Sequence, residues 1–424
     1  MAVPETPQPE RVAVIGLGYV GLPLAVRAAE AGFDVVGLDV DELRVKRLAA
    51  GDSPVEDITG ERLLAALDGG RLRVTCDAAD LDGFDICVIS VPTPLREGAP
   101  DLSYVESAGR AVAPHLRPGA TVVLESTSYP GTTEDLLRPL LEAGSALTAG
   151  RDFHLGYSPE RIDPGNARWR LENTPKVVSG VDPASLEAVE AFYDRIVQRT
   201  VPVSSTRTAE LTKLLENTFR QVNIALVNEL ALCAGPLGVD IWEAVDAAAT
   251  KPFGFMPFYP GPGVGGHCLP VDPSYLSWQV RRRLQHDVRF VSLAQEINDG
   301  MPEQVVRRVE QALGRPAAGA RILLLGLAYK KNTGDVRESP AVTIAERLLS
   351  RGARVRAVEP YADPLRLPSE VLCVELTAPE LREADAVIVA TDHDCIDYEL
   401  VVREAAYVFD ARNRCARARN VERL

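Results

Sequence analysis

The segment from Pro257 to Pro273 combines a thiol and a carboxylate in a run rich in glycine and proline, PFYPGPGVGGHCLPVDP. Cys268 and Asp272 are four residues apart in it. Glycine lets the backbone approach a ligand and proline fixes the surrounding chain, so we predict a rigid loop that presents Cys268. A thiol near a base is the starting material of covalent catalysis. A structural turn around a buried cysteine is the alternative interpretation.

A helical pattern from about Ser204 to Pro236 carries the next polar pair, Lys213 and Asn217. Residues four apart lie on one face of a helix, so the two side chains belong to the same face. A solvated lysine on a surface face is the alternative. The length of this pattern favours a spine that links two domains or packs against a second subunit. After the cysteine loop we predict a further helical region from Pro273 to about Gly314.

The start of the chain has the order strand, glycine motif, helix, strand and acid. The apolar run Arg11–Ile15 precedes GLGYVG at Gly16–Gly21, an alanine-rich helical pattern, and a second apolar run that ends at Asp39. The glycines allow a tight turn and let a pyrophosphate approach the N-terminus of the helix, which binds anions. Asp39 can bind a ribose diol and would repel a 2′-phosphate, so we predict binding of NAD rather than NADP.

Three more buried strands of this domain lead into polar segments. They are the strand 85–90 before VPTP, the strand 121–124 before ESTSYPGTT, and the run LGYSPER at 155–161. Ligands of parallel sheets bind at the carboxyl ends of the strands, so we expect these loops to converge on one edge of one sheet. Ordinary loop composition explains any one of them, but explains all three together less well.

A second set of alternating strands and helices follows. We predict strands near 319–329, 354–360, 386–391 and 407–410, and a charged stretch at 412–424 that frays. The predicted fold is α/β, with two Rossmann-like doubly wound domains joined by a long central helix and a helical connector. We place the boundaries at 1–203, 204–314 and 315–424. Lys330, Lys331 and Arg337 follow the first strand of the second domain and indicate a second anion site there, unless they form a solvated loop.

Composition excludes several classes of protein. The 424 residues carry a net charge of −14, which disfavours binding to nucleic acid or to anionic membranes. No apolar run is long enough to span a membrane, and the N-terminal MAVPETPQPE lacks the pattern of a signal peptide, so we expect a cytoplasmic protein. The seven cysteines and five histidines show no metal-binding spacing, so we predict no metal and reduced thiols.

Taken together, these motifs resemble the UDP-glucose/GDP-mannose dehydrogenase family over nearly the whole chain. The resemblance rests on GLGYVGLPLA, VPTP, ESTSYPGTT, YSPERIDPGN, TKLLENTFR, GPGVGGHCLPVDP and YKKNTGDVRESPA. The forms at Pro159–Asn166 and Lys251–Gly263 are most similar to the branch that oxidises UDP-N-acetylglucosamine at C6. The resemblance implies four-electron oxidation of a primary alcohol to a carboxylate, with two NAD per sugar and a nucleotide-diphospho-sugar as substrate. It also implies a homodimer.

The resemblance further implies a role for each candidate residue. Cys268 would form a thiohemiacetal and then a thioester, while Lys213 and Asn217 stabilise the developing oxyanion. Asp272 would act as a base, with Glu160 and Thr127 around the reacting carbon and its water. The residues expected to contact the UDP-sugar, beside Glu160, Lys213 and Asn217, are Phe258, Tyr259, Gly265 and Lys330. Those expected to bind NAD are Gly16, Gly18, Tyr19, Val20, Gly21, Asp39, Arg44, Thr93, Thr127 and Arg337.

One position departs from the family pattern. Members that act on UDP-glucose commonly carry a second glutamate four residues after the first, and Pro164 stands there in this chain. Activation of water therefore falls on Glu160 and Asp272. His267 adjoins the thiol, but adjacent loop residues usually point apart, so we assign it no catalytic role.

Several functions stay open at this point. UDP-N-acetylglucosamine is favoured, and UDP-glucose, TDP-glucose and UDP-N-acetylmannosamine are alternatives with the same chemistry. A two-electron 3-hydroxyacid dehydrogenase shares the first domain and a helical Lys-x-x-x-Asn pair, but needs neither the thiol nor the second domain. A non-enzymatic alternative is a regulator that binds NAD or sugar without catalysis. Against it stands the presence of all four candidate catalytic residues, Lys213, Asn217, Cys268 and Asp272.

Overall fold

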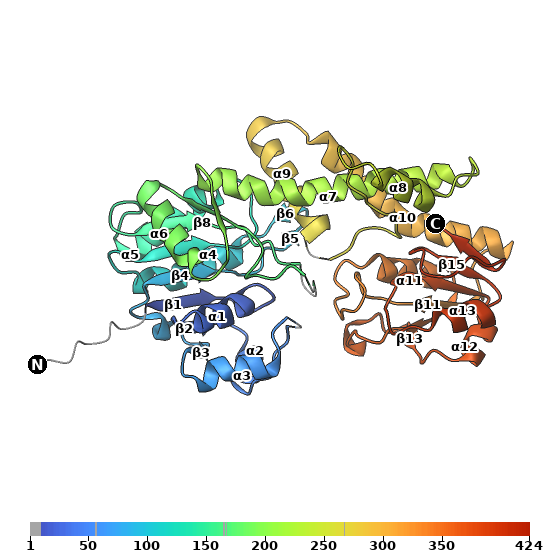
Figure 1. The fold of residues 1–424 in the computed structure, drawn as a ribbon, viewed down its shortest axis with the longest axis horizontal. Coiled ribbons are helices and arrows are strands. Elements are labelled where there is room, and N and C mark those ends of the chain that lie inside the picture. The colour runs from blue at the N-terminus through green and yellow to red at the C-terminus, as the bar shows by residue number, and fades with distance from the viewer. Residues whose placement is uncertain (1–9, 56, 164–165, 167, 267) are drawn as a thin grey trace, which may run out of the picture. The chain divides into compact units, whose positions relative to one another are not determined.

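The structure is a computed structural model that describes residues 10–424 except 56, 164–165, 167 and 267; of Cys268 it describes the backbone. The chain divides into two compact units, Met1–Glu216 and Asn217–Leu424 (Figure 1). Helix α7 (Thr206–Ala234) begins in the first unit and continues into the second. The three domains predicted from the sequence, 1–203, 204–314 and 315–424, stay predictions.

The first unit contains an eight-stranded sheet in the order β10-β9-β8-β7-β4-β1-β2-β3. The neighbours in this order are parallel, apart from β8 and β9, which are antiparallel. The order β3-β2-β1-β4-β7-β8 is that of a doubly wound dinucleotide-binding domain. The strands are β1 (Arg11–Ile15), β2 (Asp34–Leu38), β3 (Leu72–Thr75), β4 (Ile86–Ile89), β7 (Thr121–Leu124), β8 (His154–Tyr157), β9 (Lys176–Gly180) and β10 (Thr200–Pro202), and a separate hairpin joins β5 (Leu95–Arg96) to β6 (Ala99–Pro100).

Two apolar clusters cover the two faces of this sheet. Alternate residues of β1 belong to different clusters: Val12 and Val14 lie in one, and Ala13 and Ile15 lie in the other. This period of two is the alternation of a strand that is buried on both faces. The helices of the first unit before α7 are α1 (Gly21–Glu30), α2 (Glu42–Ala49), α3 (Gly60–Asp68), α4 (Ser103–Val112), α5 (Arg138–Ser145) and α6 (Pro183–Asp194).

The second unit repeats the arrangement on a smaller scale. Its sheet has the order β13-β12-β11-β14-β15-β16, and all neighbours are parallel. Ile322 and Leu324 of the central strand face one apolar cluster, and Leu323 and Leu325 face the other. The strands are β11 (Arg321–Leu325), β12 (Arg354–Val358), β13 (Leu372–Cys373), β14 (Ala386–Val389), β15 (Val408–Asp410) and β16 (Val421–Arg423). The helices are α8 (Ile241–Ala249), α9 (Cys268–Leu284), α10 (Arg289–Leu313), α11 (Pro340–Ser350), α12 (Ala378–Glu383) and α13 (Tyr398–Glu404).

Both sheets confirm the predicted α/β class with two Rossmann-like domains and a long linking helix. The prediction for the end of the chain was wrong. The stretch 412–424 contains β16, which pairs with β15, and Leu424 is buried. Charge alone suggested fraying, but main-chain pairing at a sheet edge is independent of side-chain charge. Among the described residues, no helix has the length and hydropathy needed to cross a bilayer.

The predicted loop around Cys268 was partly wrong as well. Residues 257–266 form no regular helix or strand, as predicted, but Cys268 is the first residue of α9. Proline disfavours the interior of a helix and is tolerated in its first turn, where the N–H groups have no partner within the helix. Pro270 lies in that first turn and removes no bond within the helix, while Pro273 lies inside α9, so the prolines did not exclude the helix as the sequence argument held. A break at 285–288 separates α9 from α10.

Candidate active site

Four predicted residues of the first unit follow neighbouring parallel strands. Gly16 follows β1, Asp39 follows β2, Thr93 lies beyond β4 and Thr127 lies beyond β7. These strands are adjacent in the order β7-β4-β1-β2, so their carboxyl ends form one edge of the sheet. Thr93 is buried and Thr127 is half-buried there. The structure therefore brings together loops that the sequence predicted to converge.

The glycine motif has the geometry that a dinucleotide needs. Gly16 has a φ of +92°, and a Cβ there would lie 2.7 Å from the carbonyl oxygen of Ser90. A Cβ at Gly21 would lie 1.8 Å from the carbonyl oxygen of Gly16. At Gly18 no described atom lies within 4 Å of the Cβ position, so this glycine leaves open space beside the backbone. Helix α1 has no side-chain cap among the described residues, which leaves its N-terminus available to a pyrophosphate.

Asp39 is buried and carries several hydrogen bonds at this edge. One carboxylate oxygen accepts from the Leu17 N–H at 2.8 Å and from the Arg44 guanidinium at 2.8 Å, and the other accepts from the Asp41 N–H at 3.0 Å. Arg44 lies in the first turn of α2, which Asp41 caps. The charge of Arg44 is thus paired with Asp39, and the carboxylate keeps a fixed position at the site expected for a ribose. These residues fit NAD.

Lys213 and Glu160 form the centre of the predicted catalytic group in the first unit. Lys213 lies on α7 and is buried; its Nζ donates to the Glu160 carbonyl oxygen at 2.6 Å and lies 4.0 Å from the Glu160 carboxylate. That carboxylate also accepts from the N–H of Ile162. Burial raises the pKa of Glu160, while the charges of Lys213 and Lys176 lower it in part. A carboxyl group with a raised pKa beside a buried ammonium is suited to proton transfer.

The second unit holds the other predicted catalytic residues. Asn217, one helical turn beyond Lys213, donates from Nδ2 to the Asp272 carboxylate at 2.5 Å. Both side chains are buried. Asp272 lies in α9, four residues after Cys268, so both belong to its first turns. The thiol of Cys268, together with His267 and Pro164, lies outside the described part of the chain.

The predicted sugar-binding loop is held from several sides within the second unit. The Gly261 N–H donates to the side-chain oxygen of Asn228 at 2.9 Å, and Asn228 pairs in turn with Asn298. The Tyr259 hydroxyl donates to Asp246 at 2.8 Å, and its ring stacks on Trp242. Phe258 contacts Phe219 of α7 edge to face, with ring centroids 5.6 Å apart. These contacts fix the loop that precedes Cys268.

Gly265 is required by close packing. A Cβ there would lie 2.7 Å from the carbonyl oxygen of Glu338 and 2.7 Å from the Cβ of Tyr329. Because Tyr329 precedes Lys330, the loop with Gly265 and the segment with Lys330 lie side by side. Arg337 is paired with Asp335 at 2.6 Å; burial raises the pKa of Asp335, but the hydrogen bonds and charge of Arg337, together with the charge of Arg366, lower it overall. Its predicted contact with NAD stays a prediction.

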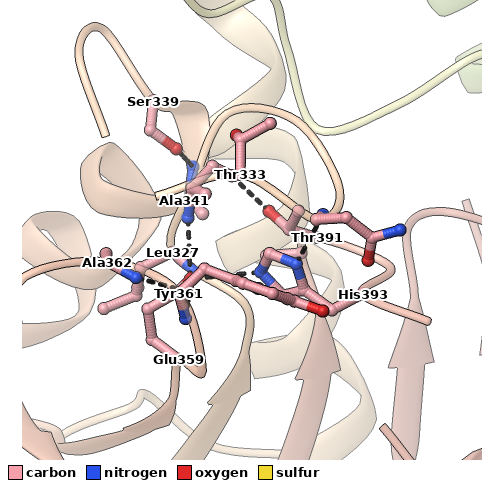
Figure 2. A network of polar contacts seen from close by, with 12 residues as sticks. Leu327, Thr333, Ser339, Ala341, Glu359, Tyr361, Ala362, Thr391 and His393 are labelled. Atoms are coloured by element: carbon pink, nitrogen blue, oxygen red, sulfur yellow. Dashed lines mark hydrogen bonds and ion pairs between the residues drawn. The ribbon is translucent and has the colours of Figure 1, made fainter. Parts of the chain in front are cut away.

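The first βα turn of the second unit repeats the backbone of the first. Gly326 has a φ of +80°, and the Leu327 N–H donates to the Glu359 carboxylate at 2.6 Å, as the Leu17 N–H does to Asp39. The Glu359 carboxylate also accepts from the N–H groups of Ala328, Tyr361 and Ala362. His393 Nδ1 accepts from the Asn332 N–H, so its Nε2 carries the proton and donates to Glu359 at 3.2 Å (Figure 2). In the second unit, the acid at the end of the second strand, Glu359, therefore stabilises the fold by holding neighbouring backbone groups and His393.

Sequence reasoning missed several buried polar residues. Glu359 and His393 gave no motif, and Glu125 was only one polar residue in ESTSYPGTT. Lys176 has no sequence signal, since it stands alone before an apolar run. A buried lysine could be recognised only once its strand was known to lie inside the sheet.

Family profiles match three parts of the chain. The NAD binding domain, the central domain and the UDP binding domain of the UDP-glucose/GDP-mannose dehydrogenase family match residues 10–197, 207–300 and 323–417. The chain is 38% identical over 412 residues to the UDP-N-acetyl-D-mannosamine dehydrogenase of Pyrococcus horikoshii, covering 95% of each. It is 37% identical over 388 residues to the UDP-N-acetyl-D-glucosamine 6-dehydrogenase of Pseudomonas aeruginosa, covering 90% of each. A solved UDP-glucose dehydrogenase of Pyrobaculum islandicum superimposes with a TM-score of 0.88 at 32% identity, over 100% of this chain and 99% of that one.

Proposed function

The chain belongs to the UDP-glucose/GDP-mannose dehydrogenase family, and from this premise we propose that it oxidises C6 of a UDP-linked N-acetylated hexosamine to the carboxylate. It is an NAD-dependent oxidoreductase of nucleotide sugars. The observation that carries the proposal is the pair of buried contacts one turn apart on α7, Lys213 to Glu160 and Asn217 to Asp272. A buried ammonium and an amide on one helical face are suited to an oxygen that gains charge.

In the first oxidation, the C6 hydroxyl loses its proton and C6 loses a hydride. The Gly16–Gly21 turn and Asp39 would hold NAD, which would supply the hydride acceptor. We assign Lys213 to the stabilisation of the alkoxide, because its ammonium is desolvated and fixed by the Glu160 carbonyl. Asn217 is oriented by Asp272, so that its amide has a fixed direction relative to the helix. The product of this step is a C6 aldehyde.

In the second oxidation, the Cys268 thiolate adds to the aldehyde carbon and forms a thiohemiacetal. This carbon still carries a hydrogen, so the thiohemiacetal can lose a second hydride and its hydroxyl proton and become a thioester; a second NAD would be the hydride acceptor. Water then attacks the thioester carbon and releases the carboxylate and the thiol. The covalent bond keeps the aldehyde on the enzyme between the two oxidations. Asp272, four residues from Cys268, is assigned to proton transfer with the thiol.

We assign activation of the hydrolytic water to Glu160. Its pKa is raised by burial, which makes the carboxylate a better base than an exposed one, and Lys213 beside it is available for the oxyanion of the tetrahedral intermediate. Thr127, on a loop of the same sheet edge, is assigned to the same region. Pro164 cannot share this task, because it has no acidic group.

For the substrate, we assign the diphosphate to Lys330 and the sugar to the loop with Phe258, Tyr259 and Gly265. The packing of Gly265 against Tyr329 places that loop next to the lysine segment, which supports a common binding region. The N-acetyl group at C2 is supported by the names of the mannosamine and glucosamine relatives. These two relatives are named for sugars that differ in configuration at C2, so the epimer is a question for experiment.

The test is the number of NADH formed per sugar consumed at completion. UDP-N-acetylglucosamine, UDP-N-acetylmannosamine and UDP-glucose are offered separately with excess NAD. We expect two NADH per sugar with one of the N-acetylated epimers and less turnover with UDP-glucose. One NADH with a free aldehyde would contradict the covalent mechanism, and preference for UDP-glucose would contradict the substrate class. Cys268→Ala should bind the sugar and form no carboxylate.

We also propose a homodimer formed through α7. Leu211, Leu215, Phe219, Leu226 and Leu230 are all about half exposed, and their spacing places them on one face of the helix. Such a stripe is unfavourable in water and suited to a second copy. Leu226→Glu with Leu230→Glu should give a monomer in sedimentation velocity, whereas Leu365→Glu, at an exposed leucine outside α7, should not. A wild-type monomer would refute the proposal.

A further inference from the structure

A buried ion pair lies beside the proposed catalytic glutamate and has no part in the mechanism described so far. The Nζ of Lys176, on β9, lies 2.6 Å from a carboxylate oxygen of Glu125, which directly follows β7. The Tyr193 hydroxyl of α6 donates to the same oxygen at 2.6 Å. All three side chains are almost fully buried, and Lys176 also lies over the Tyr193 ring. Burying two charges is unfavourable unless they are paired and hydrogen-bonded, and here the pair is completed by the Tyr193 hydroxyl.

The direction of β9 explains how a lysine reaches this place. The parallel strands of this sheet end at the edge where the polar loops gather. If β9 were parallel to them, its first residue would lie at the opposite edge. β9 is antiparallel to β8, with Gly156 opposite Gly180 and Tyr157 opposite Ser179. Continued along the chain, this register sets Lys176 opposite Glu160. The first residue of β9 therefore lies at the functional edge.

Two lysines hold the backbone that carries Glu160. Lys176 Nζ donates to the Pro159 carbonyl oxygen at 3.2 Å, and Lys213 Nζ donates to the Glu160 carbonyl oxygen at 2.6 Å. Ser158, one residue earlier, donates its hydroxyl to the Val177 carbonyl oxygen at 2.7 Å. The turn from Ser158 to Glu160 is thus fixed from β9 on one side and from α7 on the other.

The ion pair also acts on the charge of Glu160. Burial raises the pKa of Glu160; Lys213 and then Lys176 lower it, and Glu125 raises it. The charged and titratable groups that face Glu160 are therefore Lys213 from α7, Lys176 from β9 and Glu125 after β7, with Tyr193 of α6 behind Glu125. The two members of the pair act on Glu160 in opposite directions, and that difference can be measured.

We propose that Lys176, anchored by Glu125 and Tyr193, is a positioning residue for the hydrolytic step, which holds the Ser158–Glu160 turn and supplies a second positive charge beside the Glu160 carboxylate. This inference rests on the proposed role of Glu160 as the group that activates water. It assigns Lys176 no contact with the sugar or with NAD.

The experiment compares the acid limb of the kcat–pH profile in four proteins. Lys176→Met removes the positive charge that lowers the pKa of Glu160, and the limb should move to higher pH by about one unit, the size of shift that a nearby opposite charge gives. Glu125→Gln removes the negative charge, and the limb should move to lower pH. The double variant replaces the pair by neutral groups of similar size and should fold even where a single variant does not. Its limb should lie between wild type and Lys176→Met, since Lys176 acts on Glu160 more strongly than Glu125 does.

Lys176→Arg keeps the charge and should keep the limb within about 0.3 unit of wild type, below the one-unit displacement expected from loss of the charge. If the acid limb of the kcat–pH profile lay at the same pH in all variants and only the melting temperature changed, the ion pair would have a structural role alone. That result would overturn the proposal. The same titration can be followed without turnover, from the infrared carboxyl band that disappears in Glu160→Gln. Two NADH per sugar in the wild type establishes the proposed function separately. Failure of that count, with the infrared shifts still present, would refute the function and leave the electrostatic part standing.

Discussion

Replacing Glu359 by glutamine should destabilise the second unit by about 3 kcal/mol at neutral pH. Burial alone raises the pKa of Glu359, but hydrogen bonds from His393, Leu327 and Tyr361 outweigh it and lower the pKa to about 2, from an ordinary value of 4.5. A difference of about 2.5 units corresponds to about 3 kcal/mol in favour of the ionised form in the folded state. Glutamine has the shape of the neutral acid, so it should lose this contribution.

The geometry gives the same magnitude by a separate route. If the amide oxygen of glutamine keeps the contacts to Leu327, Ala328 and His393, its NH₂ group faces the N–H groups of Tyr361 and Ala362. Each donor left unpaired costs about 1–3 kcal/mol where it is buried. Because the pKa of Glu359 is depressed, its contribution is fully present above about pH 4.5 and is lost as the pH falls toward 2.

The assay is hydrogen exchange read by mass spectrometry, with β11 as the reporter and β1 of the first unit as an internal reference. A loss of 3 kcal/mol should lower the protection of β11 about 100-fold at pH 7 and leave β1 unchanged. Glu375→Gln removes an exposed charge from the same unit and should change protection less than threefold. Protection of β11 in Glu359→Gln within threefold of wild type would refute the reasoning.

Three further predictions concern the first unit. Asp39→Asn should raise KM for NAD at least tenfold and permit turnover with NADP, because residue 39 then has no charge to repel a 2′-phosphate or to pair with Arg44. An unchanged cofactor preference in initial rates would contradict this. Lys213→Met should lower kcat by 100-fold or more and change KM for the sugar little. If steady-state kinetics gave a kcat within tenfold of wild type, Lys213 would have no part in the chemical step. Burial raises the pKa of Glu210 to about 7 against hydrogen bonds from Gly131 and Thr133, so its stabilising contribution is present below pH 4.5 and lost as the pH rises through 7. Urea unfolding should show a decline of about 3 kcal/mol over that interval that is absent in Glu210→Gln, and parallel pH profiles would contradict the assignment.

The sequence by itself determined the elements whose signal is local. The order strand, Gly16–Gly21, helix, strand, Asp39 depends on nearest neighbours in the chain, and it predicted β1, α1 and β2 within a residue or two. The same holds for α7, since a periodic pattern of nearly thirty residues can form little else. Family membership followed from the same local motifs, and all three profiles confirmed it.

Local rules were weaker where two of them competed. Five prolines and four glycines in 257–273 predicted a loop, but proline in the first turn of a helix is permitted, and α9 begins at Cys268 and also contains Pro273. The charged end of the chain predicted fraying, yet it pairs as β16. In both places the outcome depends on partners that are distant in sequence.

Only the tertiary structure decided which polar residues are buried together. Glu125, Lys176 and Tyr193 are separated by up to 68 residues, and no spacing rule relates them. Their meeting depends on the reversal of a single strand, since β9 runs against β8 and so starts where the parallel strands end. A strand pattern in the sequence has no direction relative to its neighbours, because the alternation of side chains is the same in either sense. The sheet supplies that direction, and with it a second positive charge beside Glu160.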